Sequence, residues 1–82
     1  MKLMVFNIYH TDNCVQCKMT MKQCDALGIP YQETNISQHP EIAEQLKAEG
    51  YAKAPIVKVL DDAQQVQDEW FGFRPDRIRA FA

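Results

Sequence analysis

The chain lacks the features that mark three large protein classes. It has only three cysteines, an odd and low number that argues against a secreted scaffold held by several disulfides. No apolar run approaches the roughly 20 residues of a membrane span, and the apolar stretch at the N-terminus is too brief for a signal peptide. At a net charge of −2 the charged residues are scattered, without the basic stripe of a nucleic-acid-binding protein. We therefore expect a cytoplasmic monomer that binds other proteins rather than membranes or nucleic acids.

Internal repeats, low-complexity segments and linkers are lacking as well. Hydrophobic residues make up 46% of the 82 residues, an ordinary share for a globular chain. This length leaves room for one hydrophobic core. We expect a single domain that covers residues 1–82.

Strand and helix patterns alternate along the chain. Lys2–Tyr9 is rich in apolar and aromatic residues and predicts a buried strand, and Val15–Leu27 has apolar residues at helical spacing before the stop at Gly28. The same signals predict a strand at Tyr31–Ile36, a helix at Pro40–Glu49, strands at Ile56–Leu60 and Val66–Phe71, and a closing helix at Arg74–Phe81. The order βαβαββα favours an α/β fold in which three helices flank a four-stranded mixed sheet, with the first two strands parallel and joined by a right-handed crossover.

Cys14 and Cys17 lie where the first strand gives way to the first helix. A cysteine at a helix N-terminus meets unpaired N–H groups and the positive end of the helix dipole, which stabilise a thiolate. In a C-x-x-C setting these effects lower the cysteine pKa from about 8.5 to about 7 or below. Cys14 is therefore the candidate nucleophile. Cys17, one turn later, is placed to attack the mixed disulfide that Cys14 forms.

Cys24 tests whether the cysteines instead bind a metal or form a structural crosslink. In an unbroken helix it lies about 10 Å beyond Cys17, too far for a disulfide or for a shared tetrahedral zinc. Cys17, Thr20, Met21, Cys24 and Leu27 fall on one helical stripe, so we expect Cys24 to be an inert core residue. The two histidines, His10 and His39, are far apart in the sequence and are expected to lie on the surface.

Three segments together resemble the NrdH-redoxin family of glutaredoxin-like proteins. They are CVQC at residues 14–17, GYAKAPIV at residues 50–57 and WFGFRPDRI at residues 70–78, and the similarity runs nearly from end to end. The resemblance implies the thioredoxin fold and a small cytosolic dithiol carrier whose only redox group is the Cys14–Cys17 pair, with no added cofactor or metal. It also implies the partners: the large subunit of class Ib ribonucleotide reductase as electron acceptor, and thioredoxin reductase, rather than glutathione, as electron donor.

The resemblance also assigns site residues. It makes Cys14 the attacking and Cys17 the resolving thiol. It marks Pro55 as a cis-proline facing the dithiol, with the backbone of Ala54 turned outward to pair with an extended substrate. It gives a docking role to a segment that replaces the glutathione-binding residues of other glutaredoxins, although two of its aromatic residues, Trp70 and Phe73, could equally be core residues. The segment comprises Trp70, Phe71, Gly72, Phe73, Arg74, Pro75 and Asp76.

Some positions depart from the family pattern. His10 stands where the family usually has threonine or serine, Phe71 stands where serine is common, and the segment Asp61–Glu69 is longer than the usual hairpin. Phe71 could alter the docking face. Two alternatives stay open: a glutathione-dependent glutaredoxin of the same fold, and a non-redox module in which the C-x-x-C pair helps to bind a metal.

Overall fold

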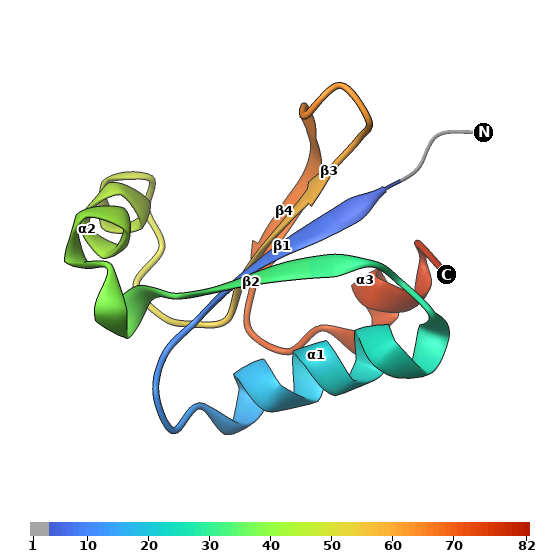
Figure 1. Cartoon of the computed structure of the whole chain (residues 1–82), viewed down its shortest axis with the longest axis horizontal. Coiled ribbons are helices and arrows are strands. Elements are labelled where there is room, and N and C mark those ends of the chain that lie inside the picture. The colour runs from blue at the N-terminus through green and yellow to red at the C-terminus, as the bar shows by residue number, and fades with distance from the viewer. Residues whose placement is uncertain (1–3) are drawn as a thin grey trace.

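The computed structural model describes residues 4–82, which form four strands, three α-helices and one short 3₁₀ helix (Figure 1). The predicted beginning of the first strand, at Lys2, lies outside the described residues. In order, the elements are β1 (Val5–His10), α1 (Val15–Leu27), β2 (Tyr31–Asn35), η1 (Ile36–Gln38), α2 (Pro40–Ala48), β3 (Ile56–Leu60), β4 (Val66–Phe71) and α3 (Pro75–Arg79).

The four strands form one sheet in the order β2-β1-β3-β4. β1 and β2 are parallel, whereas the β1–β3 and β3–β4 pairs are antiparallel. The parallel pair is connected through α1, as a parallel connection requires a crossover. This topology is the thioredoxin fold, and it confirms the order and the mixed sheet that the sequence predicts.

Three elements are shorter than the sequence predicts, by one or more residues. β2 ends at Asn35, because the side chain of Asn35 accepts a hydrogen bond from Ser37 N at 2.9 Å and starts η1 instead. α2 ends at Ala48, with Glu49 as its C-cap. α3 starts at Pro75 rather than at Arg74, because a residue before proline is driven out of the helical region; Arg74 has ψ 79°. It ends at Arg79, before the predicted end at Phe81, with Ala80 as its C-cap.

The core lies on one face of the sheet. Phe6 and Ile8 alternate with less buried neighbours on β1, and they pair in register with Val59 and Val57 of β3. Trp70 of β4 completes this face and meets the ring of Phe6 edge to face at a centroid distance of 5.7 Å. Together with side chains from α1, α3 and the chain end, this layer holds the sheet against two helices.

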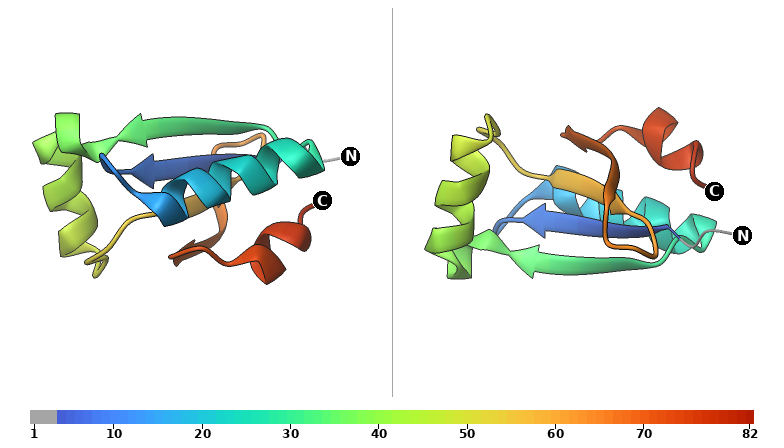
Figure 2. Two further views of the ribbon diagram at one scale, coloured as in Figure 1. Left: turned by 90° about the horizontal axis from the view of Figure 1, so that it is seen from below. Right: turned by 90° about the horizontal axis from the view of Figure 1, so that it is seen from above.

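The helices are divided unequally around the sheet. α1 and α3 contact each other and cover the core face, and α2 stands apart from them near the end of β2 and the start of β3 (Figures 1 and 2). The β1–α1 turn and the loop between α2 and β3 consequently reach the same end of the sheet. None of the helices in residues 4–82 combines the length and the apolar character needed to cross a membrane.

Candidate active site

Cys14 is the N-cap of α1. Its backbone is extended, with φ −103° and ψ 104°, and its Sγ accepts a hydrogen bond from the backbone N–H of Cys17 at 3.1 Å. Asn13, directly before it, has φ 57°, a left-handed conformation that asparagine tolerates better than most residues. The turn therefore directs the Cys14 sulfur at the unpaired N–H groups of the first helical turn, which are the groups that stabilise a thiolate.

Cys14 and Cys17 form a disulfide, with their Cα atoms 5.2 Å apart. The two sulfurs differ in access, because Cys14 is half-buried whereas Cys17 is only 1% exposed. In the reduced protein an outside disulfide can reach Cys14 and not Cys17. The geometry thus fits an attacking thiol at the tip and a sheltered thiol behind it, the arrangement that thiol–disulfide exchange needs.

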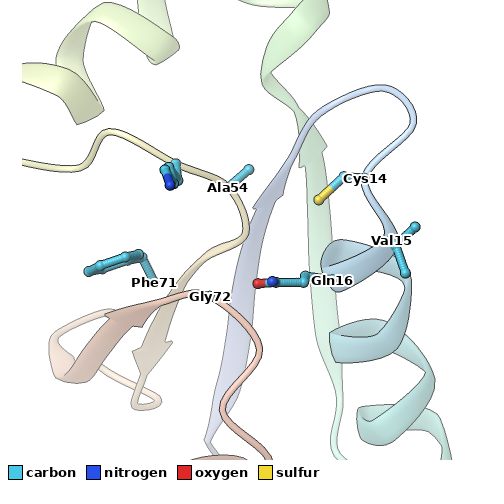
Figure 3. A pocket seen from close by; sticks show the side chains of 7 residues that line it. Cys14, Val15, Gln16, Ala54, Phe71 and Gly72 are labelled. Atoms are coloured by element: carbon cyan, nitrogen blue, oxygen red, sulfur yellow. The ribbon is translucent and has the colours of Figure 1, made fainter.

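A hollow of about 470 Å³ opens beside Cys14 (Figure 3). Three separate segments form it: the first turn of α1, the loop before β3, and the end of β4. The Ala54–Pro55 peptide bond in the loop is cis, as the resemblance implies. The lining residues are Cys14, Val15, Gln16, Lys53, Ala54, Phe71 and Gly72.

Trp70 and Phe71 point to opposite sides of β4, as successive strand residues do. Trp70 is 3% exposed, so its indole belongs to the core and is not accessible for docking. Of the two roles that the sequence left open for Trp70, the structure confirms the core role. Phe71 is 54% exposed and lines the hollow. Of the two aromatic side chains, only Phe71 is available to a partner at this hollow.

The ring of Phe71 packs against the ring of Tyr51. The ring of Tyr51 meets it edge on at a centroid distance of 6.4 Å, and the Tyr51 hydroxyl donates a hydrogen bond to Glu69. Burial, together with this bond, raises the pKa of Tyr51 to about 12, so the phenol stays protonated and remains a donor near neutral pH. The wall of the hollow is therefore fixed by side chains from outside it.

The remainder of the predicted docking segment is divided between core and surface. Gly72 lines the hollow, whereas Phe73 is half-buried, packs against the core and borders a second hollow along α1. Pro75 opens α3, and the exposed side chains of Arg74 and Asp76 face each other at 3.9 Å. These last three residues do not line the hollow beside Cys14, so a direct role for them in docking there stays a prediction.

Gln16 connects α1 to the segment after β4. Its Oε1 accepts a hydrogen bond from the backbone N–H of Phe73 at 3.3 Å. Gly72, between Phe71 and Phe73, has φ 83°, a conformation that glycine adopts without strain. The turn after β4 is thereby held against the first turn of the helix that carries the dithiol.

Sequence reasoning missed Val15, Gln16 and Lys53 as lining residues. Two of them were detectable, because Val15 and Gln16 lie between the cysteines and must occupy the first exposed turn of α1. For Lys53 the only signal was its position directly before Ala54, which the resemblance had already placed at the site.

A small polar network fixes the turn that leads into Cys14. The backbone N–H of Asp12 donates to Ser37 Oγ at 3.2 Å, and Asn35 Nδ2 donates to Asp12 Oδ1 at 2.9 Å. The network ties the β1–α1 turn to the end of β2 and to η1. Because Cys14 follows two residues later, this network helps to position its sulfur.

Cys24, at the other end of α1, is a fully buried free thiol in the core, as predicted. Burial, with Asp25 nearby, raises its pKa to about 11. The prediction that His10 lies on the surface is wrong: its side chain is 15% exposed, and its Nε2 is 3.3 Å from Glu33 Oε1 on β2. His39 is exposed, beside Glu41. Within residues 4–82, no three metal-ligating side chains gather into one cluster.

Comparison with known proteins agrees with this geometry. The glutaredoxin family model matches residues 6–64, most of the chain. The glutaredoxin-like protein NrdH of Salmonella typhimurium is 35% identical over 92% of this chain and 85% of its own length. The chain belongs to the glutaredoxin family. NrdH of Lactococcus lactis is 33% identical to this glutaredoxin-like protein, over 92% of this chain and 96% of its own.

Solved structures place the chain in the same group. NrdH-redoxin from Escherichia coli, a glutaredoxin-like protein described as having a thioredoxin-like activity profile, superposes with a TM-score of 0.83 at 32% identity over 95% of each chain. Thioredoxin from Trichomonas vaginalis, at 14% identity and a TM-score of 0.74 over 94% of this chain and 74% of its own, shares the fold. The protein is thus an NrdH-like, glutaredoxin-like redox protein with a C-x-x-C disulfide.

Proposed function

We propose that this glutaredoxin-like protein is a cytoplasmic dithiol carrier that reduces protein disulfides, with class Ib ribonucleotide reductase as its acceptor and thioredoxin reductase as its donor. The observation that carries the proposal is the unequal access of the two active-site sulfurs: Cys14 is half-buried at the edge of a hollow, whereas Cys17 is 1% exposed. The similarity to NrdH proteins supports the choice of partners.

The reaction proceeds in two exchanges. The Cys14 thiolate attacks one sulfur of the target disulfide, and the other target sulfur leaves as a thiolate that takes up a proton. Cys17 loses its proton and attacks Cys14, which releases the second target sulfur and leaves the Cys14–Cys17 disulfide. Two electrons pass to the target, and the donor, thioredoxin reductase, must then reduce the Cys14–Cys17 disulfide again.

The hollow favours a protein segment over glutathione as the partner. A tripeptide with two carboxylates is best held by paired polar and charged groups, whereas the lining of this hollow has a single charged side chain, Lys53, beside the exposed ring of Phe71 and the side chain of Val15. Apolar and aromatic area is characteristic of protein docking sites. An extended segment of the ribonucleotide reductase that carries its cysteine pair would lie along Ala54, with one of its sulfurs over Cys14.

Two reduction assays test the donor. Oxidised protein is incubated with NADPH and thioredoxin reductase, and in parallel with NADPH, glutathione and glutathione reductase, while NADPH consumption is followed. We expect turnover in the first assay and little in the second. Rapid reduction by glutathione alone would overturn the proposed donor and favour the glutathione-dependent alternative.

The acceptor is tested by trapping. A Cys17→Ser variant should form a stable mixed disulfide through Cys14 with an oxidised tail peptide of a class Ib ribonucleotide reductase, because the resolving thiol is missing. Chemical shifts perturbed by the peptide should cluster at Cys14, Ala54 and the segment 71–73. Perturbations confined to other surfaces would contradict this docking mode.

A further inference from the structure

Lys53 is the only charged side chain among the residues that line the hollow beside Cys14. It is exposed, and the lining contains no carboxylate. Across residues 4–82 the ion pairs do not include Lys53, in contrast to Lys58, whose Nζ lies 2.6 Å from Glu49 Oε1. The hollow therefore carries one positive charge that no side chain of the described chain neutralises.

The position of this charge matters more than its existence, because the protein as a whole has a net charge of −2. Lys53 precedes Ala54, the residue against which an extended substrate would lie, and it lines the same hollow as Cys14. A target sulfur above Cys14 would bring the residues next to it in the target within reach of the Lys53 side chain. A carboxylate there would meet an unpaired ammonium group.

We propose that Lys53 selects protein disulfides that have an acidic residue beside the attacked cysteine. The occupant is an extended acidic peptide segment, recognised by the ammonium group of Lys53 and by the exposed ring of Phe71 in the same hollow. This inference rests on the proposed function and specifies the chemistry of its substrates. Lys53 is here a specificity residue that binds substrate and takes no part in the electron transfer.

The ring of Phe71 gives the hollow an apolar part in addition to the charge of Lys53. Phe71 is backed by Tyr51, and Glu69, the nearest carboxylate along that strand, is occupied as the acceptor of the Tyr51 hydroxyl. The apolar wall offers nothing to a charged residue, whereas Lys53 attracts a carboxylate. One side of the cysteine in the target should therefore favour an acid, and the other an apolar residue.

The test uses single-turnover kinetics with synthetic peptides. Each peptide has an internal disulfide and differs only in one residue beside its first cysteine, which is Glu, Gln or Lys; a second set varies the residue on the other side. Reduced protein is mixed with oxidised peptide and quenched in acid, and the peptide dithiol is measured. Because the protein supplies both electrons, no reductase is present.

We expect the Glu peptide of one set to react about two- to fivefold faster than the Gln peptide, the range expected for one exposed ion pair, with the Lys peptide slowest. Lys53→Gln should remove this order and Lys53→Glu should reverse it. Raising the salt concentration should shrink the preference, because exposed charges are screened. Lys22→Gln, which changes the net charge equally but borders the other hollow, should keep the order.

The outcomes separate the two proposals. If none of the peptides is reduced, the proposed function is wrong. If all are reduced at equal rates, or if Lys53→Gln slows the Glu, Gln and Lys peptides alike, the disulfide chemistry stands and charge selection by Lys53 is refuted. Glutathione disulfide also carries carboxylates. If Lys53→Gln lowers the rate of reduction only for glutathione disulfide, Lys53 binds the tripeptide, and the acidic-segment proposal is wrong.

Discussion

The two ends of α1 carry the same functional group in opposite chemical states. Cys14 caps the N-terminus, is half-buried and lines a hollow, whereas Cys24 is 0% exposed inside the core. The helix dipole and free N–H groups favour an anion at the first end, and desolvation raises the thiol pKa to about 11 at the other. We therefore expect the reactivity of a cysteine in this protein to depend on its position along α1.

The largest expected effect comes from removing the reactive end. Cys14→Ser should lower disulfide reduction at least about a thousandfold, because the attacking thiolate is lost. Cys17→Ser should also stop turnover, but it should accumulate mixed disulfides with the target. Reductase-linked assays and mass spectrometry under non-reducing conditions measure both. Continued turnover in Cys14→Ser would show that the assignment of the nucleophile is wrong.

Alkylation of the reduced protein compares the two ends directly. At pH 7 a pKa of about 11 leaves about one Cys24 thiol in ten thousand ionised, whereas a pKa of about 7 at a helix N-terminus leaves about half of Cys14 ionised. We expect iodoacetamide to label Cys14 at least about a hundredfold faster than Cys24, as resolved by peptide mapping. Labelling of Cys17 ahead of Cys14 would reverse the roles of the two active-site thiols.

The buried Cys24 should lower the stability of the fold at high pH. The pKa of Cys24 is raised on folding from 9.0 to about 11, so its contribution to stability is complete below pH 9 and is lost as the pH rises through 11. Between pH 8 and pH 11 the free energy of unfolding should fall by about 2 kcal/mol more in the wild type than in Cys24→Ala.

Urea titrations without oxygen measure this difference, and Cys24→Ala cancels the contribution of the tyrosines and lysines that titrate in the same range. Equal losses in the two proteins would mean that Cys24 is already accessible to water in the folded state.

Removing the buried thiol at neutral pH should have a smaller effect. Cys24→Ala leaves a small cavity in the core and should cost about 1–2 kcal/mol of stability. The rate of disulfide reduction should stay within about twofold of the wild type, since Cys24 is a free thiol that lies outside the hollow. A folded Cys24→Ala variant that no longer transfers electrons would show that this end of α1 is not inert.

The smallest effect is expected from Gln16, whose side chain links the N-terminal turn of α1 to the segment after β4. Gln16→Ala removes the acceptor of the Phe73 N–H, a hydrogen bond of about 0.5–1.5 kcal/mol, and loosens the turn that carries Phe71 and Gly72. We expect KM for a protein disulfide to rise about two- to fivefold with little change in kcat. Gln32→Ala, at an exposed position on β2, is the matched control. A fall in kcat at constant KM would instead place Gln16 in the chemical step.

Much of this architecture could be predicted from the sequence because the local signals agree with the fold. The bounds of α1, β3 and β4 match the predicted ranges residue for residue, since Gly28 ends α1 in a left-handed conformation and the two strands are short runs around a polar turn. The end of β2 and the start of α3 were less predictable, because a side-chain cap at Asn35 and the proline after Arg74 decide them.

The sequence by itself determined the order of the elements, the dithiol and the place of Cys24 in the core, because each depends on periodicity or on spacing along one helix. Only the tertiary structure decided which side chains the dithiol faces. Trp70 and Phe71 are adjacent and both aromatic, yet the pleat of β4 buries one and exposes the other, and the register with β3 sets which is which. Likewise, Gln16, Lys53 and Gly72 line one hollow with Cys14 only because three distant segments come together at one edge of the sheet, a juxtaposition that no local pattern encodes.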